Sequence, residues 1–337
     1  MTSNSSPKTR PDKREILAQA ILDGCPVTEL AARFVAAGYS ETAANYEAGR
    51  AVKDPLFSAA RRVGNRVGKR DWTLAIYRRL HAAEAGGDRT VPVIDRIEPA
   101  IFFRHFHHRN RPVKLTGLVD HWPAMERWNF DYLVEKIGNT VVELQGQRLS
   151  AGDYELAKDR HKRHIAFSNF IQALRQTESS NDFYMTAYND TVNKQALAPL
   201  WQDVADISLL RSSGGQDGFF WIGPKGTITP FHHDLTNNLL LQISGRKRVK
   251  MVAAYDTAYM RNHIHCFSEW ASSAEMAAQD KDAPHIWECD IGPGEAIFLP
   301  VGWWHHVEAL DHTIGMSFTN FPYDNDFYAD YPGETVF

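Results

Sequence analysis

The stretch Thr229-Pro-Phe-His-His-Asp-Leu-Thr-Asn-Asn238 places two histidines and an aspartate at the end of a short run with strand character. Successive side chains of an extended strand point to opposite faces, so we expect His232 and Asp234 on one face and His233 on the other. A second histidine pair follows in Leu299-Pro-Val-Gly-Trp-Trp-His-His-Val-Glu308. These two segments therefore predict a site built from strands that are distant in the sequence.

The surrounding chain is rich in short runs of β-branched and aromatic residues, each bounded by Gly, Pro or Asn. The runs span residues 112–117, 140–144, 219–223, 238–243, 248–252 and 295–299. Helical patterns are confined to the neighbourhood of residues 130–137 and 169–175. Many short strands with close turns are typical of an antiparallel barrel or a double-sheet jelly roll. We therefore expect a mainly β domain over residues 89–337.

The chain before residue 89 has a different sequence pattern. A polar tail over residues 1–12 is expected to be disordered, and apolar residues then recur at helical spacing over residues 13–88. Gly86-Gly87-Asp88 ends this helical domain. Residues 1–90 contain 15 Lys and Arg against 10 Asp and Glu, a charge of +5, whereas the remainder has a charge of −9. The charge difference and the change of hydrophobic pattern together predict that the chain has two parts.

Composition restricts the class of protein. The 337 residues are 43% hydrophobic and 23% charged, as in globular proteins, and contain no apolar run long enough to span a membrane. The opening residues are polar and basic, which argues against a secretory signal. Three cysteines, Cys25, Cys266 and Cys289, cannot form a disulfide framework. We therefore expect a cytoplasmic protein without a membrane partner.

Two histidines and one carboxylate on the inner face of a barrel would hold Fe(II) by one face and leave the opposite positions open. A His-x-Asp pair alone is a weak signal, because such pairs are common on surfaces. Lys247 strengthens this signal. It is spaced by two residues from the apolar Val249 and by four from the apolar Met251, so all three share one face of the strand and Lys247 should also point inward. A buried lysine is costly unless it meets an anion, which a carboxylate co-substrate would supply.

Three long motifs in this chain resemble the Jumonji-C, or cupin-like, hydroxylases. They are the stretch from Thr229 already quoted with its continuation to Arg248, the segment 292–308 beginning Gly-Pro-Gly-Glu, and the segment 111–123 beginning Arg-Pro-Val-Lys. The resemblance covers residues 91–323 and is greatest to the asparaginyl hydroxylases of hypoxia-inducible factor. It implies a double-stranded β-helix (jelly-roll) barrel, with His232, Asp234 and His305 as iron ligands. His305 is preferred to His306 because the family's ligand directly follows the tryptophan.

The same resemblance implies a site for 2-oxoglutarate. Lys247 would pair with the distal carboxylate, and the hydroxyls of Thr229 and Tyr184 would donate to it. Asn238 and Asn320 match positions that hydrogen-bond near the iron. Tyr184 also fits a core aromatic residue, Asn238 a turn residue and Asn320 a strand cap, so these alternatives remain open.

The implied reaction is hydroxylation of a side chain in a peptide or protein, using O2 and 2-oxoglutarate and releasing succinate and CO2. Alternatives are hydroxylation of a free small molecule, N-demethylation of methyl-lysine, and ligand binding without catalysis. His233 and Pro322 stand where the asparaginyl hydroxylases carry aromatic residues. Both positions touch the expected substrate face, so a preference for asparagine does not follow from the resemblance.

The N-terminal helices offer few signals of a partner. Residues 26–47 have the rhythm of a helix-turn-helix, but the second helix offers Glu41, Asn45, Glu47 and only Arg50, which is a poor set for phosphate contacts. Nucleic acid is therefore not the expected partner. The basic cluster between residues 61 and 79 favours a homodimer or presentation of a substrate.

Overall fold

The computed structural model describes residues 11–150, 152, 154–212, 216–270, 273–279, 284–329 and 331–332. The chain forms two compact units, Met1–Ala83 and Glu84–Phe337. Residues 1–10 of the predicted disordered tail lie outside the described residues. Asp12, predicted as the last residue of that tail, instead caps the first helix, because its side chain accepts a hydrogen bond from the Arg14 amide at 2.7 Å.

The first unit is helical, as its apolar spacing predicts. Its helices are α1 (Lys13–Leu22), α2 (Leu30–Ala36), α3 (Glu41–Lys53) and α4 (Pro55–Glu84), whose last residue belongs to the second unit. The sequence pattern predicts two separate helical stretches, over residues 55–63 and 69–85, but helix α4 runs continuously through Gly64 and Gly68 between them. Each interior glycine costs about 1 kcal/mol relative to alanine, and this helix tolerates both. No described helix has both the length and the apolar character needed to cross a membrane.

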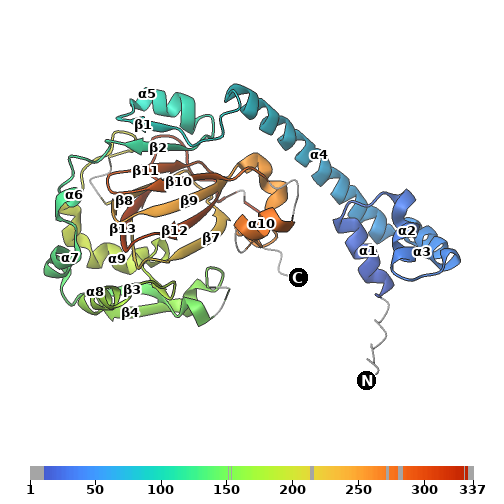
Figure 1. The fold of residues 1–337 in the computed structure, drawn as a ribbon, viewed down its shortest axis with the longest axis horizontal. Coiled ribbons are helices and arrows are strands. Elements are labelled where there is room, and N and C mark those ends of the chain that lie inside the picture. The colour runs from blue at the N-terminus through green and yellow to red at the C-terminus, as the bar shows by residue number, and fades with distance from the viewer. Residues whose placement is uncertain are drawn as a thin grey trace, which may run out of the picture. The chain divides into compact units, whose positions relative to one another are not determined.

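The described strands of the second unit form three sheets (Figure 1). The six-stranded sheet contains, in spatial order, β1 (Val93–Asp95), β2 (Val113–Thr116), β11 (Ala296–Leu299), β8 (Asn238–Ser244), β13 (Thr313–Phe318) and β6 (Phe219–Gly223). The four-stranded sheet contains β10 (Trp287–Ile291), β9 (Lys247–Val252), β12 (Trp304–Ala309) and β7 (Ile228–His233). The small sheet contains β4 (Lys162–Ala166), β3 (Val141–Gly146) and β5 (Phe183–Tyr184). The predicted mainly β jelly-roll fold is confirmed.

Strand pairing brings distant segments of the chain together. Neighbouring strands of the two larger sheets are antiparallel, except for the parallel pair β1 and β2. Strand β12 lies between β9 and β7, and its register places His305 directly opposite His232. The two histidine segments, about 70 residues apart in the sequence, are therefore adjacent in space.

Five helices contribute side chains to the apolar core on one face of the six-stranded sheet. They are α5 (Pro99–Phe102), α6 (Pro123–Arg127), α7 (Phe130–Ile137), α8 (Phe167–Gln176) and α9 (Asp190–Ala196). Helix α10 (Ser273–Gln279) contributes Met276 to a separate apolar cluster. Leu133 of α7 and Leu174 of α8 share one apolar core with Leu239 and Leu241 of β8. The intervening Leu240 lines a pocket on the other face of the strand. Alternation along β8 thus separates the core from the site.

Candidate active site

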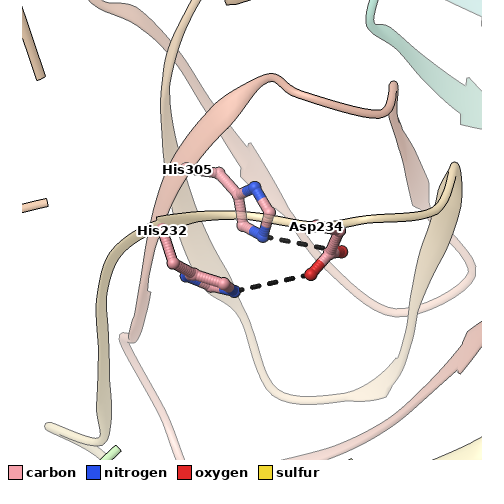
Figure 2. A group of neighbouring side chains, drawn as sticks. All are labelled: His232, Asp234 and His305. Carbon is pink, nitrogen blue, oxygen red and sulfur yellow. Dashed lines mark ion pairs between the residues drawn. The ribbon is translucent and has the colours of Figure 1, made fainter. Parts of the chain in front are cut away.

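The centre of the site is a cluster of two histidines and one aspartate (Figure 2). His232 lies in β7, His305 in β12, and Asp234 directly follows the end of β7. One ligand atom from each of the three residues lies within 4.8 Å of the other two. The structure therefore brings together the three residues predicted as metal ligands.

Backbone carbonyls orient both imidazoles. The Nδ1 atom of His232 lies 2.9 Å from the Pro230 carbonyl oxygen, and Nδ1 of His305 lies 3.0 Å from that of Trp303. Carbonyls only accept hydrogen bonds, so each Nδ1 carries the proton and each Nε2 presents a lone pair. The Nε2 atoms face Asp234, at 3.7 Å from Oδ1 for His232 and 3.8 Å from Oδ2 for His305. Two nitrogens and one oxygen so arranged fit Fe(II).

The environment keeps the donors in the forms that bind a metal. Burial lowers the pKa of His305 to about 4, so the ring is neutral near pH 7. Burial alone would raise the pKa of Asp234, but the two imidazoles and a hydrogen bond from Asn238 hold it below its ordinary value. The Asn238 amide donates that bond to Oδ2 at 2.9 Å. Asn238, predicted to lie near the iron, thus orients the carboxylate.

The two histidines and the aspartate form one wall of a pocket of about 50 Å³ between the sheets. Side chains from all three sheets line it: Tyr184, Trp221, Thr229, His232, Asp234, Asn238, Leu240, Lys247, Leu299, His305 and Val307. Of the eight residues predicted for the site, seven therefore share one cavity.

Lys247 is the cation of this pocket. Its side chain is only 1% exposed, and its Nζ donates a hydrogen bond to the Tyr184 hydroxyl at 3.1 Å. Among the described residues, no carboxylate lies within ion-pair distance of it, and burial lowers its pKa to about 7. The amine therefore becomes a stable cation when an anion enters the pocket.

Close backbone approach positions Tyr184. A Cβ atom at Gly223 would lie 2.5 Å from Cδ2 of the Tyr184 ring, so only glycine leaves room for the ring there. Sequence reasoning missed Trp221, which lines the pocket and lies over Lys247, with its ring centroid 5.8 Å from Nζ. The sequence held a signal that could have identified Trp221: strict alternation in the predicted strand 219–223 puts Trp221 and Gly223 on one face.

Asn320 lies apart from this pocket. Its amide donates hydrogen bonds to the Arg211 carbonyl at 2.8 Å and to Asp217 Oδ2 at 3.2 Å. It borders a separate cavity with Trp201 and Phe318. The residue before it, Thr319, faces the cleft outside the metal cluster, so alternation turns Asn320 away. The structure therefore does not place Asn320 near the metal ligands.

A wider cleft, of about 520 Å³, adjoins the two histidines and the aspartate. It shares Thr229, Trp221 and Asn238 with the inner pocket, and Phe267 and Tyr328 line it as well. A small inner pocket and a larger cleft therefore meet at the predicted metal ligands.

Comparison with known proteins gives one family. The cupin-like domain family matches residues 99–327. Lysine-specific demethylase JMJ30 of Arabidopsis thaliana is 27% identical over 64% of this chain and 51% of its own length; lysine-specific demethylase 8 of Xenopus tropicalis is 26% identical over 68% and 54%. The human tRNA wybutosine-synthesizing protein 5 is 22% identical over 69% of this chain and 78% of its own length.

The chain spans about half the length of the two demethylases. The residues that match the cupin-like domain, 99–327, include His232, Asp234, His305 and Lys247. More than two thirds of the chain falls within the cupin-like domain. The chain belongs to the cupin-like, Jumonji-C family.

Proposed function

We propose that this chain hydroxylates an amino-acid side chain of a peptide or protein, using Fe(II), O2 and 2-oxoglutarate. Lys247 is the observation that carries the proposal: it is a buried cation, and among the described residues no carboxylate pairs with it. It shares one pocket with the two histidines and the aspartate. A 2-oxo diacid that chelates the metal at one end and meets Lys247 at the other satisfies both features.

The bound iron and 2-oxoglutarate would together supply the oxidation, in which one oxygen atom enters the substrate as C–OH and the other enters succinate, with loss of CO2. The protein residues hold and orient the reactants. His232, Asp234 and His305 would occupy one face of the metal. Because Lys247 donates to the Tyr184 oxygen, the Tyr184 proton is free to point to the distal carboxylate, beside the Thr229 hydroxyl.

The outer cleft supports a polypeptide substrate, since it is wider than the oxo acid requires. The finer similarity to the asparaginyl hydroxylases stays a prediction, as do a cytoplasmic location, a homodimer and the division of roles between residues 13–88 and 89–337. Two relatives are named lysine-specific demethylases, which makes N-demethylation the second candidate. Both reactions use the same inner pocket.

The products separate these candidates. The full chain is incubated with Fe(II), 2-oxoglutarate, O2 and a peptide library, with succinate, formaldehyde and peptide mass recorded. Hydroxylation predicts succinate with a peptide gain of one oxygen atom, whereas demethylation predicts formaldehyde and loss of a methylene. Asp234→Ala is the control and should form no succinate above the metal-free background. Equal succinate from the variant and the parent would contradict the proposed site.

A further inference from the structure

Arg148 is a fully buried arginine that no step above uses. It lies two residues after the end of β3, in the short helical turn Arg148–Ser150, and its side chain has no solvent exposure. A buried guanidinium is costly unless its N–H groups are bonded. Its contacts therefore indicate what the residue is there to hold.

One set of contacts fixes the start of β7. Arg148 Nη2 donates to the Ile228 carbonyl oxygen at 2.8 Å, and Nη1 donates to Asn181 Oδ1 at 3.0 Å. The same Asn181 oxygen accepts the Ile228 amide at 2.8 Å. Both backbone polar groups of Ile228 are thus held by the Arg148–Asn181 pair. The next residue is Thr229, whose side chain lines the inner pocket.

A second set of contacts fixes Tyr184. The guanidinium carbon of Arg148 lies 5.4 Å from the centroid of the Tyr184 ring and 4.2 Å from that of Tyr154. Cations within about 6 Å of an aromatic centroid are attracted to the ring face. Tyr184 also meets Lys247 at its hydroxyl and Gly223 at its ring. Arg148 therefore restrains the ring that carries the second hydroxyl donor.

The charge of Arg148 is matched inside its own network. Its Nη2 lies 2.9 Å from Oε1 of Glu155, a carboxylate that is itself almost fully buried. Arg148 is thereby neutralised, whereas Lys247 has no carboxylate at ion-pair distance among the described residues. One uncompensated positive charge remains, which suits one carboxylate of an incoming diacid. The guanidinium is thus available to orient neighbouring groups without competing for that anion.

We propose that Arg148 is a positioning residue for the oxo acid: one guanidinium sets both hydroxyl donors, Thr229 through Ile228 and Tyr184 through its ring. The inference rests on the proposed 2-oxoglutarate site. It assigns affinity for the diacid to a residue that lines neither the inner pocket nor the outer cleft. His232 lies farther along β7, Asp234 follows the end of that strand and His305 lies in β12, so we expect metal affinity to be independent of Arg148.

Direct binding measurements test this. Full-length protein is titrated anaerobically, first with Fe(II) and then with 2-oxoglutarate, by calorimetry. Arg148→Lys keeps the charge but loses the planar fork, and the double variant Arg148→Gln/Glu155→Gln removes both charges without leaving one unpaired. We expect each to raise the Kd for 2-oxoglutarate roughly tenfold, the effect of one lost hydrogen bond to a charged group. The Kd for Fe(II) should stay within about twofold of the parent.

A matched control separates positioning from stability. Asp203 is a buried carboxylate that accepts hydrogen bonds from Arg127, Trp128 and Tyr132, outside both cavities. Asp203→Asn should lower the melting temperature and leave the Kd for 2-oxoglutarate unchanged. The inference is overturned if the Arg148 variants bind 2-oxoglutarate as the parent does, or lose Fe(II) and 2-oxoglutarate in parallel. A parent protein that binds Fe(II) but no 2-oxoglutarate would instead overturn the proposed function itself, and the inference with it.

Discussion

Strands β7 and β12 each carry two adjacent histidines, and the two faces of the sheet use them differently. His232 and His305 converge on Asp234. His233 instead packs edge-on against Trp304 at a centroid distance of 4.7 Å, and His306 packs against Phe231 at 5.5 Å. The residue type and the strand are the same, so the face of the strand and the nearby carboxylate decide which histidine can bind a metal.

The pKa values of the histidines do not distinguish the two faces of the sheet. Burial lowers the pKa of both His305 and His306 to about 4, so both rings are neutral near pH 7. Their hydrogen bonds differ: Nδ1 of His305 donates to the Trp303 carbonyl, whereas Nδ1 of His306 has no partner among the described residues. Orientation by the backbone, rather than charge, prepares His305 as a ligand.

The largest expected effect separates these neighbours directly. His305→Ala removes one of three ligands and should weaken Fe(II) binding by more than about 100-fold, beyond the range for residues that only orient ligands. His306→Ala removes packing in an apolar cluster and should lower the melting temperature while Fe(II) affinity stays within a few-fold. Calorimetry with Fe(II) measures both. Equal losses of Fe(II) affinity in the two variants would contradict the claim that only the face with His305 binds the metal.

The second effect concerns the other end of the inner pocket. Lys247→Met should weaken 2-oxoglutarate binding by roughly 10- to 100-fold, the value of a charge-assisted hydrogen bond, and leave Fe(II) binding intact. The same change should raise the melting temperature of the ligand-free protein, because a buried cation is replaced by an apolar side chain. A variant that is less stable and still binds 2-oxoglutarate would contradict the role given to Lys247.

The pH dependence follows from the same lysine. Its pKa falls from 10.5 in the unfolded chain to about 7 in the folded protein, because burial penalises the charged form. Between these values the unfolded chain binds more protons, so this group makes the ligand-free protein more stable as pH rises from 7 to 10.5. Affinity for 2-oxoglutarate should fall over the same window, approaching tenfold per pH unit.

Lys247→Met is the control for this titration, since it should show neither the gain in stability nor the pH-dependent affinity. Denaturant unfolding and calorimetry at pH 7, 8 and 9 provide the two measurements. An affinity that stays constant from pH 7 to 9 in the parent protein would show that the oxo acid does not bind to a titrating lysine.

The smallest effect compares two asparagines that were both predicted near the iron. Asn238→Ala removes the hydrogen bond to Asp234 Oδ2 and should weaken Fe(II) binding about tenfold, as expected for a residue that orients a ligand. Asn320→Ala should change neither Fe(II) nor 2-oxoglutarate affinity by more than about twofold, because its amide binds Arg211 and Asp217 elsewhere. A tenfold loss of Fe(II) or 2-oxoglutarate affinity in Asn320→Ala would show that Asn320 acts at the site after all.

Much of the site could be predicted from short-range pattern. Strand alternation places His232 with Asp234 and turns Lys247 inward. The Thr229 and Asn238 predictions came only from the family resemblance. Thr229 lies an odd number of residues from His232, and a register shift between β7 and β12 accompanies their presence in one pocket. The register that sets His305 opposite His232 depends on pairing between distant strands, and only the family resemblance indicated it. The Asn320 prediction came from that resemblance as well, without an alternation argument of its own.

Other features depend on packing that a linear pattern does not contain. Arg148 belongs to no recognisable motif, and its partners Asn181, Glu155 and Ile228 come from three separate segments. Helix α4 continues through Gly64 and Gly68, and no proline follows them before its end at Glu84. Burial of a polar side chain and continuation of a helix both depend on neighbours, and the sequence alone does not place those neighbours.

The most direct test of the central claim is a spectroscopic titration of the anaerobic, metal-free protein with Fe(II) and then 2-oxoglutarate. If two histidines and an aspartate hold the metal and leave adjacent positions open, the chelated oxo acid produces a visible charge-transfer band. We expect that band in the parent and in His306→Ala, and its loss in His305→Ala. Bound Fe(II) without a band in the parent would contradict the account, because the open face would then not chelate an oxo acid.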